Sequence, residues 1–159
     1  RRAMRTVAAR RVEFGEGEAT GRAARPTNEA EYRELARRKT GALLRAAAER
    51  GAVAGDADPH AVDSFGEYAE RVGVAFQMRD DVLDATADAD DLGKPTGQDA
   101  EMDRPSVLQV TSLSPEEINE RARSESERAL AALDDADPPE TEAIEYLRDL
   151  AEFVVVRER

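Results

Sequence analysis

Apolar residues recur every three or four positions along most of the chain, a spacing typical of helices that bury one face. The pattern predicts helices over residues 28–50, 59–84, 106–113 and 114–133, after a helix end over residues 1–13. A final helix is predicted from five apolar positions: Ile144, Leu147, Leu150, Ala151 and Val154. No alternating pattern of the kind that strands require is longer than a few residues. We therefore expect an all-α fold of five or six helices.

Helix starts and stops are marked by residue type. Asn28 is a suitable N-cap, Asp58 is followed by Pro59 at the first helical position, and Ser114 opens a capping box with Glu117. Glycines and prolines predict breaks at 15–26, 51–58 and 134–140, and a loop over 85–105. The four phenylalanines and three tyrosines are expected to pack in the core.

The composition agrees with a helical domain and excludes several classes of protein. Aromatic residues make up 4% of the chain, and alanine, leucine, arginine and glutamate are abundant. The absence of cysteine excludes disulfides, thiolate metal sites and cysteine nucleophiles. Because no apolar run approaches the length of a membrane span and no apolar signal region is present, we expect a cytoplasmic protein without membrane spans.

The formal net charge of −12 argues against nucleic acid or an anionic membrane as partner. Lys39 and Lys94 are the only lysines among 23 basic residues. Abundant carboxylates with few large apolar side chains are typical of proteins from organisms that accumulate salt, so a halophilic source is expected. A wholly disordered acidic chain is disfavoured by the periodic apolar positions.

The main candidate for chemistry is an acidic face on the helix predicted over 59–84. Gln77, Asp80, Asp81 and Asp84 fall within an arc of about 100°. Carboxylates crowded on one face repel each other, and a hard cation would offset that repulsion. Oxygen ligands without histidine or cysteine indicate Mg²⁺, with Mn²⁺ possible.

Two simpler interpretations remain open at this point. An acidic surface is expected anywhere in such a composition, so the cluster could be merely solvated. A calcium-binding loop over Asp88–Asp99 is disfavoured, because Leu92 occupies a ligand position and Asp99 stands where a glutamate is needed.

Three motifs follow one another along the chain. The first is Glu31-Tyr32 followed by Lys39-Thr40-Gly41-Ala42-Leu43-Leu44. The second is Phe76-Gln77-x-x-Asp80-Asp81-x-x-Asp84, and the third is Leu92-Gly93-Lys94-Pro95-x-Gly97-x-Asp99. In order and spacing these motifs resemble those of trans-isoprenyl diphosphate synthases, and the second is similar to that family's second aspartate-rich region. The resemblance extends from about Phe14 to Pro105 and more faintly to the C-terminus.

The resemblance implies a helical bundle of the isoprenoid synthase type, with residues 1–159 forming the later, C-terminal part of its single domain. It implies a homodimeric prenyltransferase that condenses isopentenyl diphosphate with an allylic diphosphate in isoprenoid biosynthesis, with Mg²⁺ as cofactor. The family's first aspartate-rich motif is absent here, so the chain alone is expected to be inactive. A non-catalytic partner subunit, a truncated relative and an acidic interaction module without a metal site are the alternatives.

The resemblance also implies residue roles. Asp80, Asp81 and Asp84 correspond to the metal site, with Asp81 ordering metal-bound water and the pocket. Lys39 and Lys94 would bind diphosphate oxygens, Thr40 and Gln77 would stabilise a carbocation, and Arg104 would contact substrate where many members have lysine. The two lysines support these roles independently, since a compact ammonium is suited to a phosphate oxygen and this composition otherwise favours arginine.

Overall fold

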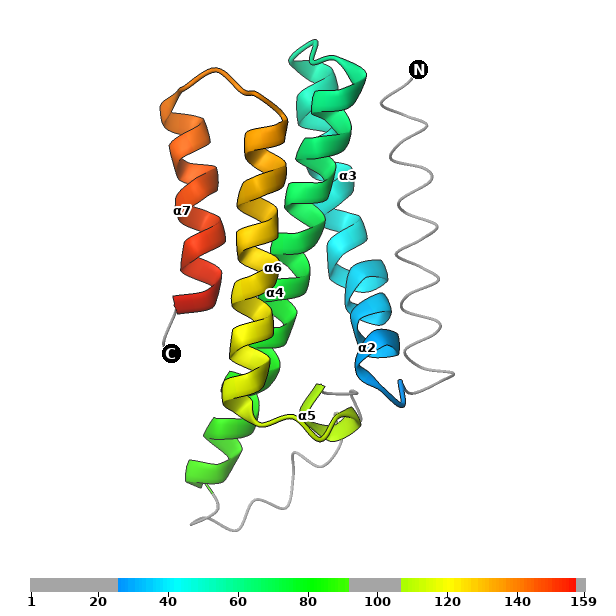
Figure 1. Ribbon diagram of the computed structural model, residues 1–159, viewed down its shortest axis with the longest axis vertical. Coiled ribbons are helices and arrows are strands. Elements are labelled where there is room, and N and C mark those ends of the chain that lie inside the picture. Colours follow the sequence, from blue (N-terminus) through cyan, green and yellow to red (C-terminus); the bar gives the residue numbers. More distant parts are fainter. Residues whose placement is uncertain (1–25, 92–106, 157–159) are drawn as a thin grey trace.

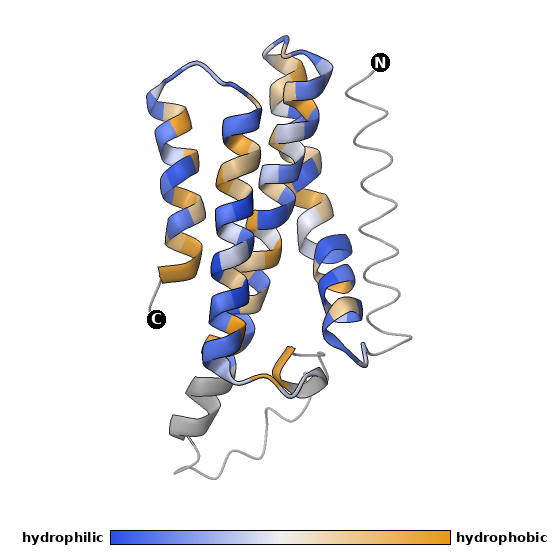
Figure 2. Ribbon diagram, in the orientation of Figure 1, coloured by the Kyte–Doolittle hydropathy of each residue, from blue (hydrophilic) through white to orange (hydrophobic). Residues whose placement is uncertain are grey.

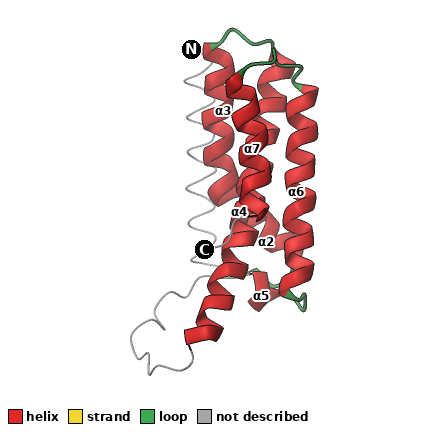
Figure 3. Ribbon diagram, turned by 90° about the vertical axis from the view of Figure 1, so that its left-hand side faces the viewer, coloured by secondary structure: helices red, strands yellow, loops and turns green. Residues whose placement is uncertain are grey.

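The structure, a computed structural model, describes residues 26–91 and 107–156, and in these ranges it consists of helices joined by turns and loops. Long helices lie side by side in a bundle (Figure 1), and the turned view shows no strand in the part described (Figure 3). The elements are α2 (Glu29–Ala36), the π-helical turn η1 (Arg37–Gly41), α3 (Ala42–Ala54), α4 (Pro59–Asp91), α5 (Val107–Val110), α6 (Pro115–Asp135) and α7 (Glu142–Val156). The all-α prediction is confirmed.

The three predicted helix starts are confirmed by their caps. The Asn28 side chain accepts a hydrogen bond from the first turn of α2. Asp58 Oδ1 accepts two backbone N–H groups at the start of α4, and these bonds lower the pKa of Asp58. The Ser114 side chain accepts from the Glu117 backbone while the Glu117 carboxylate accepts from the Ser114 N–H, which completes the capping box.

Two helix ends differ from the prediction. Helix α4 continues to Asp91, although a loop was expected from residue 85, because alanines alternate with short polar residues there and the first strong breaker is Gly93. Helix α3 continues past Gly51 to Ala54, since one glycine inside a helix costs only about 1 kcal/mol. The predicted helix end over residues 1–13 and the rest of the loop, 92–105, lie outside the described residues.

The first predicted helix is interrupted by η1, which the periodicity did not predict. Backbone angles at Ala36 and Ala42 remain helical, so α2, η1 and α3 form one continuous helix with a wider turn in the middle. The extra residue shifts the buried face. The buried positions run Tyr32, Ala36, Gly41, Ala42 and Ala46. As a result Leu43 and Leu44 face outward, with 55% and 37% of their surface exposed.

Helix α4 is the central element and packs against every other described helix. Its first half shares one apolar cluster with α6 and α7, including Val72, Ala129, Leu133 and Ile144. Its second half shares another with α2, α5 and α6, including Tyr32, Met78, Val82 and Ile118. Along each helix the hydrophobic residues are interspersed with hydrophilic ones (Figure 2), as expected for helices with one buried face.

The prediction that all aromatic residues are buried is wrong for three of them. Phe76, Tyr146 and Phe153 are exposed over 37%, 62% and 58% of their surfaces. Tyr146 and Phe153 lie on the outer side of α7, and Phe76 lies on α4. Helical spacing identifies an apolar position, but it cannot identify which of two flanking faces receives a neighbouring helix.

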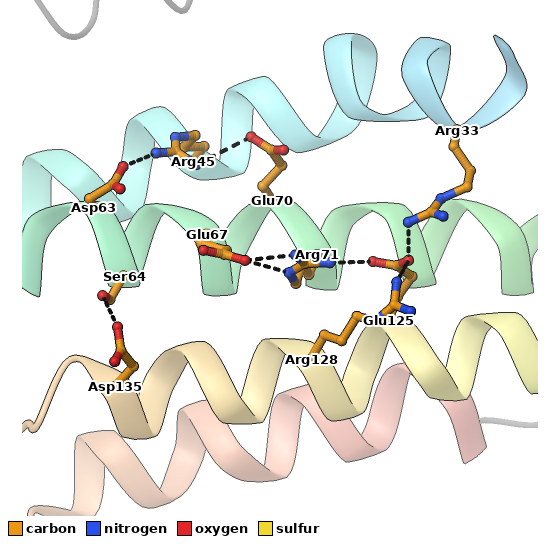
Figure 4. A network of polar contacts seen from close by, with 10 residues as sticks. All are labelled: Arg33, Arg45, Asp63, Ser64, Glu67, Glu70, Arg71, Glu125, Arg128 and Asp135. Carbon is orange, nitrogen blue, oxygen red and sulfur yellow. Dashed lines mark hydrogen bonds and ion pairs between the residues drawn. The ribbon is translucent and has the colours of Figure 1, made fainter. Parts of the chain in front are cut away.

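A buried carboxylate ties three helices together. Glu125 on α6 has 4% of its surface exposed and pairs with Arg33 of α2, with Arg71 of α4 at 3.1 Å and with Arg128 of its own helix at 3.2 Å (Figure 4). A buried charge is tolerated when it is paired in this way. The network connects α2 and α4 to α6.

None of the helices in the described ranges combines the length and the apolar character that crossing a membrane requires.

Candidate functional site

The predicted site residues come from two elements that cross. Lys39 and Thr40 lie in η1, and Gln77, Asp80 and Asp84 lie along α4 at spacings of three and four residues. Residues with these spacings share one face of a helix. A π turn of this kind is frequent at functional positions because it changes the direction of side chains within an otherwise regular helix.

Two glycines allow the close crossing of η1 and α4. A Cβ on Gly73 would lie 3.1 Å from the Gly41 Cα, and a Cβ on Gly41 would lie 3.2 Å from the Glu70 carbonyl oxygen. Both distances are shorter than ordinary van der Waals contact, so the backbones meet where side chains are absent. This contact places Thr40 next to Gln77, one turn of α4 beyond Gly73.

A chain of hydrogen bonds connects the two elements. The Thr40 hydroxyl donates to Gln77 Oε1 at 3.3 Å, and Gln77 Nε2 donates to Asp81 Oδ1 at 3.0 Å. The amide of Gln77 therefore points its oxygen toward η1 and its nitrogen toward Asp81. The structure thus brings Thr40, Gln77 and Asp81 together in one chain of hydrogen bonds.

Asp81 is also bound from two further elements. Its Oδ2 accepts a hydrogen bond from the Tyr32 hydroxyl of α2 at 2.7 Å and one from the Val107 N–H of α5 at 2.8 Å. Burial, and next the charge of Asp81, raise the pKa of Tyr32 far above its ordinary value, so its hydroxyl stays protonated and donates. From the sequence, Tyr32 was part of a family motif and was expected to pack in the core, with no role assigned to its hydroxyl. The one available indication was that a buried tyrosine needs a polar partner, and the sequence does not say which.

The side chains of Asp80 and Asp84 are more exposed to solvent than Tyr32. They are one turn apart on α4, Asp80 partly exposed and Asp84 exposed. Among the described residues, no group of three or more potential metal ligands is close enough together to hold an ion by itself. Two carboxylates nevertheless fit Mg²⁺, which uses one or two protein carboxylates and completes its shell with water and phosphate oxygens. Asp81 as a metal ligand stays a prediction.

Lys39 is half-buried, and in the described ranges it makes no ion pair. The two arginines before it are paired: Glu34 binds Arg37 at 2.8 Å and Arg38 at 2.5 Å. These hydrogen bonds, first of all the one from Arg37, lower the pKa of Glu34 to about 2. The positive charge of Lys39 is therefore available to a ligand. Lys94 and Arg104 lie outside the described residues.

An apolar surface adjoins the polar residues. Leu44 contacts the crossing, since its Cδ1 would be 3.1 Å from a Cβ on Gly73. Phe76 follows Gly73 by three residues and precedes Asp80 by four, so its exposed ring lies on the same face of α4. The face therefore combines carboxylates with exposed hydrocarbon.

A hollow of about 400 Å³ lies elsewhere, between α2, α3, α4 and α6. Its walls carry arginines and glutamates of the ion-pair network, including Arg33, Arg71 and Glu125 (Figure 4). None of the predicted site residues lines it. The hollow is therefore separate from the candidate site.

Residues 2–148 match the family described as Polyprenyl synthetase. The short chain isoprenyl diphosphate synthase of Methanocaldococcus jannaschii is 36% identical over 128 residues, which are 80% of this chain and 38% of that protein. The farnesyl diphosphate synthase of Haemophilus influenzae is 36% identical over 126 residues, 76% of this chain and 39% of the relative.

Two solved structures have a fold similar to that of this chain. A decaprenyl diphosphate synthase from Rhodobacter capsulatus superimposes with a TM-score of 0.80 at 27% identity, over 99% of this chain and 60% of that one. A polyprenyl synthetase from Streptomyces coelicolor gives a TM-score of 0.75 at 27% identity, over 98% of this chain and 59% of that one. The chain thus spans about 40% of the length of the two synthases and about 60% of the two solved structures.

Proposed function

Because the chain belongs to the polyprenyl synthetase family, we propose that the whole protein is a prenyltransferase that condenses isopentenyl diphosphate with an allylic diphosphate. The observation that carries the proposal is the crossing of η1 with α4. It joins Thr40 to Gln77 by a hydrogen bond and places both beside a face with Asp80 and Asp84. The names of the relatives, which are isoprenyl and farnesyl diphosphate synthases, support the substrate class.

Each residue has a proposed task that agrees with its surroundings. Lys39 binds a diphosphate oxygen, because its ammonium is not engaged by a carboxylate in the described ranges. The oxygens of Thr40 and Gln77 stabilise the positive charge that develops on the allylic carbon as diphosphate leaves. Exposed Leu44 and Phe76 provide apolar contact for a prenyl chain. Lys94 and Arg104 are proposed, from the sequence motifs alone, to bind substrate.

Asp80 and Asp84 are the proposed ligands of Mg²⁺ or Mn²⁺. When bound, the cation would supply positive charge that stabilises the departing diphosphate. Asp81 contributes by holding Gln77 in place, whether or not it also contacts a metal-bound water. All three residues were predicted from the spacing of the acidic motif.

We place residues 1–159 in the C-terminal part of a single synthase domain, with the first aspartate-rich motif supplied by other residues. The match of 99% of the chain to 60% of a relative's structure supports a partial domain, and the C-terminal placement rests on the order of the sequence motifs. A homodimer, a cytoplasmic location and a halophilic source are proposed from family resemblance and composition.

The test is prenyl transfer by the full-length protein in molar potassium chloride with Mg²⁺. Labelled isopentenyl diphosphate is offered with dimethylallyl, geranyl or farnesyl diphosphate, and the products are identified by mass spectrometry. We expect an elongated product that disappears when the metal is chelated. If no primer is extended, the proposal is wrong, and Mg²⁺-dependent binding of a diphosphate analogue without turnover would favour a non-catalytic subunit instead.

A further inference from the structure

Tyr32 is unusual because its hydroxyl is the polar end of an otherwise apolar, fully packed side chain. The residue is 2% exposed and lies in the apolar cluster formed with Met78, Val82 and Ile118. Its hydroxyl reaches out of this cluster to Asp81 Oδ2 at 2.7 Å. A protonated phenol at this distance from a carboxylate makes a strong, directional hydrogen bond.

The bond has consequences beyond Asp81, because the same carboxylate orients the next residue in the chain of contacts. Asp81 Oδ1 accepts a hydrogen bond from Gln77 Nε2. The other end of the same amide, Gln77 Oε1, accepts a hydrogen bond from the Thr40 hydroxyl. An amide that has its nitrogen fixed has its oxygen fixed as well, since the two ends are rigidly connected. Tyr32 therefore lies at one end of a polar chain and Thr40 at the other.

Tyr32 and Thr40 also belong to one continuous helix, formed by α2 and η1. The chain of contacts thus leaves this helix at Tyr32, passes through Asp81 and Gln77 on α4, and returns at Thr40. Such a closed connection resists rotation of the π turn relative to α4. Both ends must hold for Gln77 and Thr40 to keep their mutual orientation.

We propose that Tyr32 is a positioning residue that, through Asp81, fixes the orientation of the Gln77 carboxamide and the Thr40 hydroxyl. It touches no substrate in this proposal. The effect on catalysis rests on the proposed prenyltransferase function, whereas the effect on Gln77 does not. If Tyr32 had a purely structural role, its substitution would lower stability without changing the orientation of the Gln77 side chain.

Tyr68 provides a matched control. It is 3% exposed, it lies on α4, and its hydroxyl donates to the Leu147 carbonyl of α7 at 2.6 Å, away from the site. Tyr68→Phe removes one buried phenol hydroxyl, just as Tyr32→Phe does. The two variants are expected to lose similar stability, so any difference between them at Gln77 reports on position.

The first measurement follows the side-chain amide protons of Gln77 by NMR in the ¹⁵N-labelled full-length protein, with Gln77→Ala used for assignment. We expect slowed exchange of these protons in the wild type and in Tyr68→Phe, and faster exchange in Tyr32→Phe. Equal exchange in all three proteins would overturn the proposal. This outcome does not depend on any catalytic activity.

The second measurement is a kinetic cycle with Tyr32→Phe, Gln77→Ala and the double variant. Tyr32→Phe is expected to lower kcat about tenfold with little change in KM, because orientation matters most in the transition state. In the double variant, Tyr32→Phe should add nothing to the loss caused by Gln77→Ala. Multiplicative losses would overturn the proposal. A wild type without turnover would reject the proposed function alone, and the amide exchange would still decide the part played by Tyr32.

Discussion

Asp81 and Asp84 both lie on α4, but they differ in exposure. Asp81 is partly buried and accepts hydrogen bonds from donors on α2, α4 and α5, whereas Asp84 is exposed to solvent and Asp80 is partly exposed. A residue held by three donors is suited to orienting its neighbours.

Neutralising Asp80 or Asp84, the proposed metal ligands, should affect the metal-dependent step. Asp80→Asn and Asp84→Asn, made separately in the full-length protein, are expected to lower kcat about 100-fold, because an amide oxygen carries no charge to bind Mg²⁺. The matched control is Asp149→Asn, which neutralises an exposed aspartate of α7. The measurement is the steady-state rate of each variant over a range of Mg²⁺ concentrations. An Asp80→Asn enzyme as active as the control would contradict the proposal that Asp80 is a metal ligand.

Glu34 gives a prediction about acid stability. Its pKa is lowered from 4.5 to about 2 in the folded protein, so the folded state favours the ionised form. The resulting stabilisation is present above about pH 4.5 and is lost as the pH falls toward 2. Because 43% of the side chain is exposed, solvent screening limits the effect to less than about 1 kcal/mol.

Glu34→Gln should consequently reduce the loss of stability in acid. Urea unfolding at about pH 6 and about pH 3 should show a smaller difference for Glu34→Gln than for the wild type. Glu145→Gln, at an exposed position of α7, serves as the control and should follow the wild type. Identical pH dependence in all three proteins would show that the Arg37 and Arg38 contacts contribute nothing.

The sequence identified candidate site residues, but it did not identify the long-range contacts between them. The motif spacing placed Gln77 and Asp81 on one face of a helix, because α-helical geometry follows directly from sequence separation. Thr40, 37 positions before Gln77, was associated with them only through the family resemblance. The link from Asp81 to Tyr32 joins residues 49 positions apart. Such a contact depends on how α2 packs on α4, and no local pattern encodes it.

At the scale of elements, the decisive contact is the backbone approach of η1 to α4. Replacing Gly73 by alanine would gain up to about 1 kcal/mol of helix propensity. It would also force a methyl group to within 3.1 Å of the Gly41 Cα, where a helical backbone cannot yield easily. Overpacking of this kind costs about 1–3 kcal/mol, so the net effect should be destabilising.

Gly73→Ala is therefore expected to lower the midpoint of thermal unfolding and to lower kcat, because separation of the helices weakens the contact between Thr40 and Gln77. Gly51→Ala is the matched control, since a Cβ there meets nothing within 4 Å. That variant should gain up to about 1 kcal/mol. A stabilised and fully active Gly73→Ala protein would show that the two helices can separate without consequence.

Helix starts were predictable and some features inside helices were not, for a physical reason. An N-cap such as Asn28 or Ser114 satisfies backbone N–H groups within three residues, so its effect is local. The π turn at Arg37–Gly41 is stabilised by packing against α4, which is a tertiary effect. The sequence therefore predicted one regular helix there.

At the scale of the whole molecule, the formal charge of −12 dominates the electrostatics. Ion pairs such as Arg123–Glu120 and Arg148–Asp134 lie at the surface and contribute little to stability. Uncompensated carboxylates repel one another over the whole surface. Added salt weakens both effects, but the repulsion acts over longer distances and is screened more completely.

We therefore expect the midpoint of thermal unfolding to rise between about 0.1 M and about 2 M potassium chloride. A variant with Glu145→Gln, Asp149→Asn and Glu152→Gln changes the formal net charge from −12 to −9 at three exposed positions of α7. Its midpoint should be higher than that of the wild type at low salt and should rise less with added salt. A wild-type midpoint that falls with salt would mean that ion pairs outweigh repulsion, and the proposal of a halophilic source would lose its physical basis.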